Sequence, residues 1–343
     1  MPADEHPAPP LAELSRPVVD CLRRATGAGE DIDAALTIAA TAGTLLPVPG
    51  DGHTLERWAA LAALARANVT VARVVEAHAD ALAILAEAKS EPAAPGSTWG
   101  VFAAESPDQL LTGKPAADGT FELSGIKPWC SLGDVLDRAL VTAHVAEGRQ
   151  LFAIDLRDPR VRAEPARRWV ARGLRTVTSV PLHCDRLPAV AVGSANWYLT
   201  RDGFAWGGTG VAACWYGGAL GLADTLYRTA MGRRRPLDAL HVGTVDAHLH
   251  AAAAALRDAA VRIDSGAAGG ADGELLAMRV RAVVAEAVEH ALRQVGHALG
   301  PAPLAFDAEY AARVADLELY VRQHHAERDL DALGELLLPH AGP

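Results

Sequence analysis

The chain has 343 residues, half of them apolar, and a formal net charge of −10 at pH 7. This length exceeds what one small hydrophobic core takes up, so we expect two or three domains. The acidic balance argues against nucleic acid or an anionic membrane as a partner, because both attract basic surfaces.

The N-terminal stretch, MPADEHPAPPLAELSRP, is acidic and proline-rich, without the basic start and apolar run typical of a signal peptide. The four cysteines lie far apart and show neither a zinc spacing nor a disulfide framework. The most apolar run, residues 210–222, is too short to span a bilayer. We therefore expect a cytoplasmic protein with no metal site.

A period of three to four residues between apolar positions runs from Leu11 to Ala88 and predicts helices. Prolines and glycines between residues 47 and 52 interrupt it. The segment 55–88 is compatible with one helix or with two, and Asn68 and Thr70 mark its weak point. With the linker KSEPAAPGST at its end, we assign residues 1–95 to an N-terminal helical domain.

Short β-rich runs follow, separated by turn residues and without helices between them. They cover residues 98–105, 119–127, 138–146, 149–157 and 179–187. Such spacing is typical of an antiparallel barrel or sandwich, which we assign to residues 96–198.

Helical patterns return in four long runs, residues 212–231, 240–264, 275–299 and 307–325. Short loops rich in glycine or proline join them, which predicts a C-terminal antiparallel four-helix bundle over residues 199–343. The predicted fold class is therefore α+β: N-terminal helices, a central antiparallel β-barrel or sandwich, and a four-helix bundle. Apolar positions beyond one bundle core, such as 251–256, predict an oligomer.

Familiar catalytic motifs are absent from the sequence: it has no P-loop, no G-x-S-x-G and no H-E-x-x-H, and no G-x-G-x-x-G follows a strand. The stretch GIKPWCSLGD stands out instead, because it places an indole and a hydroxyl two residues apart in an alanine-rich chain. Trp129 offers a flat apolar surface at low entropy cost, and Ser131 offers a hydrogen-bond donor. The alternative is structural, with Trp129 in the core and Ser131 in a turn.

The order of helices, β block and bundle, together with this stretch, resembles the acyl-CoA dehydrogenase family of flavoproteins. The family pattern G-x-K-x-W-[IV]-[ST]-x-[GA] is matched at five positions: Gly125, Lys127, Trp129, Ser131 and Gly133. The resemblance extends over residues 55–334. It implies a flavin cofactor, FAD with FMN as the alternative, with Trp129 against its ring and Ser131 near its N5 atom.

Further cofactor contacts follow from the same resemblance. The stretch MGRRRP looks like a family segment whose arginine reaches the flavin pyrophosphate, often across a dimer interface, and this implies roles for Arg233 and Arg235. A solvated helix end is the other explanation for these arginines. Gln294 and Gly296 fall on the loop that meets the flavin adenine. The resemblance also implies a homo- or hetero-oligomer assembled through the bundle.

The sequence departs from the family pattern at the positions that carry the family's catalytic base. The family's catalytic glutamate position holds Val321, and the site on the first bundle helix used by some members holds Val211 and Ala212. Glu318 lies one turn before Val321 and is a candidate base or a solvated helix residue. A family segment with Gly-Ser-Asp corresponds to residues 103–110, where Glu105 alone is kept.

Two adjacent histidines, His324 and His325, follow the lost glutamate position. Some relatives of this fold are flavin monooxygenases with a histidine near this place, and the pKa of histidine suits a base at neutral pH. An exposed pair at a helix end is the alternative. Three functions stay open: α,β-dehydrogenation of an acyl thioester, monooxygenation of a small molecule, and an inactive partner subunit of a heteromeric dehydrogenase.

Overall fold

The computed structural model describes residues 6–7, 11–117 and 119–338. Its first helices are α1 (Arg16–Ala28), α2 (Ile32–Ala42), α3 (Thr54–Ala67) and α4 (Val69–Glu87). Asn68 separates α3 from α4, because its backbone is extended and its side chain accepts a hydrogen bond from the backbone N–H of Val71. The segment 55–88 is therefore two helices.

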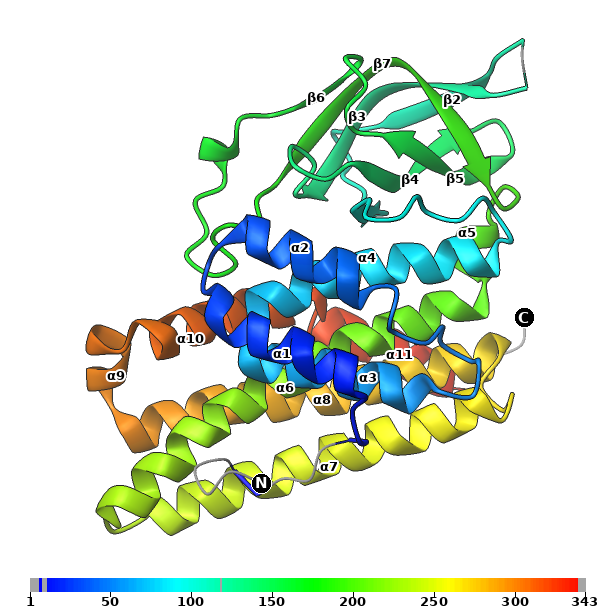
Figure 1. Cartoon of the computed structure of the whole chain (residues 1–343). Helices are drawn as coiled ribbons and strands as arrows, with labels where there is room; N and C mark the ends of the chain where they lie inside the picture. The colour runs from blue at the N-terminus through cyan, green and yellow to red at the C-terminus, as the bar shows by residue number, and fades with distance from the viewer. Residues whose placement is uncertain (1–5, 8–10, 118, 339–343) are drawn as a thin grey trace.

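Seven strands form a closed barrel (Figure 1). They are β1 (Trp99–Phe102), β2 (Leu111–Pro115), β3 (Phe121–Ser131), β4 (Arg138–Val145), β5 (Gly148–Asp155), β6 (Val161–Ala163) and β7 (Ser179–Val192). Most neighbours are antiparallel, as predicted, but β1 and β2 each pair with β4 in parallel. A pairing between β4 and β5 closes the sheet.

The remaining helices follow the barrel. They are α5 (Trp197–Thr200), α6 (Asp202–Arg233), α7 (Asp238–Asp264), α8 (Gly270–Leu299), α9 (Pro301–Phe306), α10 (Ala308–Tyr320) and α11 (Glu327–Leu337). Two 3₁₀ turns, Ala166–Arg168 and Val321–Gln323, complete the elements. The four predicted helical runs correspond to α6, α7, α8 and α10, and α6 begins ten residues earlier than its run, at Asp202.

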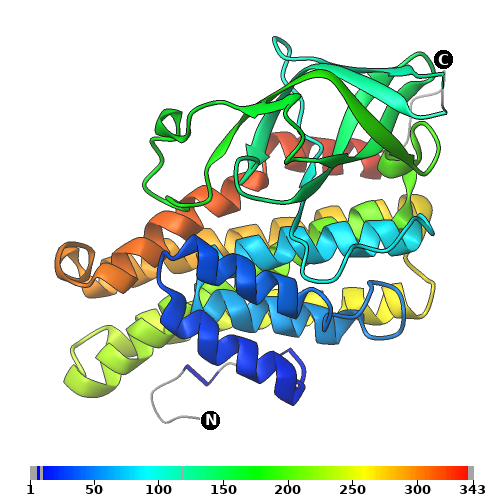
Figure 2. The same ribbon diagram turned by 45° about the horizontal axis from the view of Figure 1, so that its top comes forward.

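Helix α4 lies between the barrel and the other helices, so it faces both (Figures 1 and 2). One hydrophobic cluster includes Val75 of α4, Leu123 of the barrel and Leu317 of α10. The predicted α+β class, with helices, barrel and helical bundle in that order, is confirmed. Within the described ranges, no helix is both long enough and apolar enough to cross a membrane.

Candidate functional site

Strand β3 carries the indole and the hydroxyl on an irregular segment. The pairing of β3 with β7 slips between Lys127 and Cys130, where Pro128 has no N–H for the ladder. Trp129 has a φ of 58°, in the left-handed region, and 60% of this residue is exposed. The predicted β run ends at residue 127, whereas the strand continues through a bulge to Ser131. The indole therefore lies outside the hydrophobic core.

Lys127 fixes the inner side of this bulge. Its Nζ donates to Thr142 Oγ1 at 2.8 Å and lies 3.7 Å from Glu105, and burial lowers the pKa of Lys127 to about 8. Burial opposes the charge of Glu105, but His144, Arg149 and Lys127 together lower its pKa. Glu105, which the family pattern kept, is thus the centre of an ion-pair network with Lys127, His144 and Arg149.

Ser131 ends β3 at the contact between barrel and helices. Its Oγ lies 2.8 Å from Ser179 Oγ, and the Nη2 of Arg73 on α4 donates to it at 3.4 Å. Arg73 also pairs with Glu76 one turn later at 3.0 Å. The hydroxyl of Tyr320, at the end of α10, donates to Glu76 Oε2 at 3.3 Å. A polar chain therefore runs from Ser131 through Arg73 and Glu76 to Tyr320.

Glu76 is 7% exposed, and its burial raises the pKa of the carboxyl, although Arg73 opposes this shift. Burial also raises the pKa of nearby Asp80. A carboxylate whose pKa is raised takes up a proton more readily than an exposed one. The sequence prediction gave Glu76 no role. A signal was present, because Arg73 and Glu76 are oppositely charged residues at i,i+3 spacing in a mostly apolar helix.

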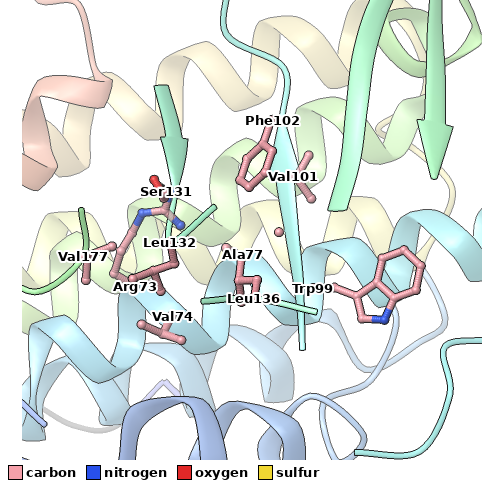
Figure 3. A pocket seen from close by; sticks show the side chains of 11 residues that line it. Arg73, Val74, Ala77, Trp99, Val101, Phe102, Ser131, Leu132, Leu136 and Val177 are labelled. Carbon is pink, nitrogen blue, oxygen red and sulfur yellow. Dashed lines mark hydrogen bonds between the residues drawn. The ribbon is translucent and has the colours of Figure 1, made fainter. Parts of the chain in front are cut away.

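The enclosed space beside Ser131 is very small. The cavity there measures about 10 Å³, which is room for about one water molecule. Figure 3 shows Arg73 and Ser131 pointing toward each other among the side chains that line it. A tricyclic ring does not fit there, so it would have to lie on the outer side of the bulge, where the indole is exposed. Trp129 and Ser131 together fit such a ring, since one gives an apolar face and the other a polar group.

The predicted catalytic residues lie beyond this polar chain. Glu318 is exposed, and His325 is exposed with its Nδ1 3.1 Å from Asp329 Oδ1. His324 is buried, and burial lowers its pKa. Among the described residues, no hydrogen bond or ion pair joins any of the three to Ser131. Val321, at the family's glutamate position, is 1% exposed.

The predicted phosphate and adenine contacts gather at the turn between α6 and α7. Arg233 Nη2 donates to the carbonyl of Ala298 at 2.7 Å, and the N–H of Arg235 donates to Asp238 at 2.7 Å. Gln294 Oε1 lies 2.9 Å from His241 Nδ1. Gly296 follows Gln294 by two residues on α8. Figures 1 and 2 show this turn at the end of the helices remote from the barrel. One chain therefore does not bring these residues to Trp129.

No protein-family model matches the chain, and neither does any curated protein sequence. Solved structures resemble it over nearly their whole length. TdsC from Paenibacillus sp. A11-2, in complex with FMN and indole, is 16% identical with a TM-score of 0.79, covering 95% of this chain and 97% of that one.

Two further structures show the same likeness. KijD3 in complex with FMN and a dTDP-linked amino sugar is 16% identical, with a TM-score of 0.79 and coverage of 95% of this chain and 94% of that one. Butyryl-CoA dehydrogenase from Megasphaera elsdenii is 15% identical, with a TM-score of 0.78 and coverage of 96% and 100%. The chain therefore has the acyl-CoA dehydrogenase fold.

Proposed function

We propose that this chain is a flavin-dependent oxidoreductase in which Trp129 covers one face of the isoalloxazine ring and Ser131 bonds to its N5 edge. The observation that carries the proposal is an indole, 60% exposed, next to a hydroxyl where the barrel meets α4. The FMN complexes of TdsC and KijD3 support a flavin for this fold. A bound flavin, FAD or alternatively FMN, would accept two electrons from the substrate.

The reaction we favour is α,β-dehydrogenation of an acyl thioester, with Glu76 as the group that takes up the substrate proton. Glu76 is the carboxyl that Arg73 links to Ser131, and its raised pKa suits proton uptake. Arg73 would bind the substrate carbonyl oxygen, because a guanidinium stabilises negative charge on oxygen. Tyr320 would hold the Glu76 carboxyl in place through its hydroxyl.

Monooxygenation of a small molecule is the second candidate, and His324 favours it. Burial lowers the pKa of this imidazole, so it stays neutral at pH 7 with one ring nitrogen able to accept a proton. The third candidate, an inactive partner subunit, predicts a protein that takes up no flavin.

Flavin titration of the purified protein tests the proposal. We expect the fluorescence of FMN and of FAD to change on binding. Trp129→Ala should weaken the affinity for flavin by roughly five- to thirtyfold, which corresponds to about 1–2 kcal/mol of lost stacking. Phe306→Ala is the matched control, because Phe306 is an exposed aromatic residue on α9, 90% accessible. A protein that binds neither flavin, or a Trp129→Ala variant with unchanged affinity, would refute the proposal.

Anaerobic mixing with acyl-CoA thioesters separates the two reactions. A dehydrogenase should bleach its flavin, because the substrate supplies the electrons. A monooxygenase should stay oxidised under these conditions and turn over only with a reductase and oxygen, and His324→Ala should then abolish turnover while flavin affinity is kept.

A further inference from the structure

A second cavity lies further along α4 than the space beside Ser131, toward the C-terminal end of the helix. It measures about 260 Å³ and is bounded by α2, by the C-terminal half of α4 and by the linker of residues 90–97. In Figure 1 this linker runs back above α4 after the helix ends. The cavity is much larger than the water-sized space beside Ser131, and it exceeds the cavity of about 150 Å³ that takes up benzene in another protein.

The walls of this cavity are mostly apolar and uncharged. Leu82 and Leu85 of α4 contribute, and alanines, prolines and small hydroxyl residues supply most of the rest. Among the described residues that line the cavity, none is charged. The cavity opens to solvent on the side of the linker, and its walls offer no counter-charge to an ionic ligand, so they favour a neutral molecule.

His78 gives this apolar cavity one directional polar group. The residue is 2% exposed, and its Nδ1 accepts a hydrogen bond from the backbone N–H of Trp99 at 3.1 Å. A neutral imidazole that accepts at Nδ1 carries its proton on Nε2. Burial lowers the pKa of His78 to about 4, which keeps the ring neutral at physiological pH. Among the described residues, no hydrogen-bond partner is found for Nε2, so this donor is left for a ligand.

Gly43 of the turn after α2 holds the imidazole edge in place. A Cβ at this position would lie 2.4 Å from His78 Cδ2 and 2.7 Å from Nε2. Only a glycine lets the helix end approach this closely, so the ring is fixed from one side by Gly43 and from the other by Trp99. A fixed donor costs less entropy to use than a mobile one.

From these observations we propose that the cavity is a binding site for a small, uncharged, mainly apolar molecule that carries one hydrogen-bond acceptor, such as a carbonyl oxygen, and that His78 Nε2 is the donor to it. The site is separate from the face that carries Trp129, and it does not depend on a flavin.

A matched pair of probes tests the site. Acetophenone has an apolar ring and a carbonyl oxygen, and α-methylstyrene has nearly the same shape with a CH₂ group in place of that oxygen. Calorimetry and ligand-observed NMR measure the two affinities. We expect wild-type protein to bind acetophenone about three- to tenfold more tightly than α-methylstyrene, which is the difference that one hydrogen bond allows.

Variants then assign this preference to His78. In His78→Asn the amide oxygen keeps an acceptor for Trp99 N–H, but the shorter side chain no longer places an N–H where Nε2 lies, so both probes should bind equally. Leu82→Phe fills part of the cavity and should weaken both probes while the preference remains, which gives a second test if His78→Asn is poorly folded. His183→Asn, on β7, should behave as wild type.

Three results would overturn the proposal: no saturable binding of acetophenone up to its solubility limit, equal affinity of wild-type protein for the two probes, or a preference that persists in His78→Asn. The first would mean that the cavity takes no such ligand. The other two would mean that His78 is not its donor.

Discussion

His78 ties the stability of the protein to pH. Its pKa is lowered from 6.5 to about 4 by burial, so between these values the unfolded chain binds a proton that the folded protein refuses. The contribution of the neutral ring to stability is fully present above pH 6.5 and is lost as pH falls toward 4. From pH 7.5 to pH 5 we expect this residue to account for a loss of about 2 kcal/mol in the free energy of unfolding.

Urea unfolding at the two pH values measures this effect. His78→Asn should lose less stability than wild type between pH 7.5 and pH 5, by that amount. His53→Asn is the control, because His53 is exposed and Glu56 raises its pKa by a hydrogen bond. If His78→Asn follows the same pH profile as wild type, the buried imidazole is not the source.

Glu76 and Glu318 give opposite predictions for the same substitution. Glu76→Gln keeps an oxygen for the Tyr320 hydroxyl but cannot take up a proton, so flavin reduction by an acyl thioester should slow by about 10²–10⁴-fold with flavin affinity unchanged. Glu318→Gln, on the exposed face of α10, should leave the rate unchanged. Stopped-flow flavin bleaching compares the two, and a slow Glu318→Gln beside a normal Glu76→Gln would reverse the assignment.

Among the elements, α10 holds the loop before β7 against α4. The N–H of Leu174 in this loop donates to Asp316 Oδ1 at 2.5 Å, and Thr70 of α4 donates to Oδ2 at 2.9 Å. The loop backbone touches the helix directly, because a Cβ on Gly173 would lie 1.9 Å from the carbonyl oxygen of Ala315. One buried carboxylate therefore joins parts of all three regions.

Asp316→Ala should destabilise the protein by about 2–4 kcal/mol, because it leaves two buried donors unpaired. The matched control is Asp307→Ala, which removes the N-cap of α10 and should cost about 1 kcal/mol. Urea unfolding compares the two variants. Equal losses would show that the Asp316 contacts add nothing beyond an ordinary helix cap.

Local pattern predicted most of the elements. The five predicted β runs contain β1 and β4 whole, all of β5 except Gly148, and parts of β3 and β7, whereas β2 and β6 were missed. Strand β2 has five residues and ends at Pro115, and β6 has three, so neither shows enough alternation to be recognised. These strands exist because their neighbours supply hydrogen-bond partners, which no local pattern reveals.

The candidate site was predictable only where its residues are close in sequence. Trp129 and Ser131 belong to one short motif. Tyr320 and Glu76 are 244 positions apart and meet only because α10 crosses α4 in the folded chain. The motif therefore gave the indole and hydroxyl, and the fold was needed to find the carboxyl behind them.

For the whole molecule, the separation of Trp129 from the α6–α7 turn has a testable meaning. If Trp129 and Arg235 serve one flavin, they must come from different copies of the chain, as the resemblance to the dehydrogenase family implies. The protein should then sediment as an oligomer of 35.8 kDa chains. When each is expressed by itself, the Trp129→Ala variant and the Arg235→Ala variant should both bind flavin weakly.

Co-expression of the two variants checks this arrangement. A mixed dimer contains one site without either substitution, so tight flavin binding should return in up to half of the sites. A mixture of Trp129→Ala with Arg262→Ala, an arginine at the other end of α7, should behave as a mixture of mutant and wild-type sites. A failure of the first mixture to regain tight binding would show that Trp129 and Arg235 of different copies do not share one flavin site.

The continuous hydrophobic cluster limits how anything reaches the carboxyl of Glu76. Since residues such as Val75, Leu123 and Leu317 share one packed interior, turning the barrel away from the helices would expose apolar surface on both. Access of a substrate to Glu76 then depends on one long side chain. Arg73, with 13% of its side chain exposed, lies between the hydroxyl of Ser131 and Glu76. A change in the rotamer of Arg73 would open this path. The rate at which substrate reaches Glu76 would then be set by a side-chain rotation and not by a slower domain motion.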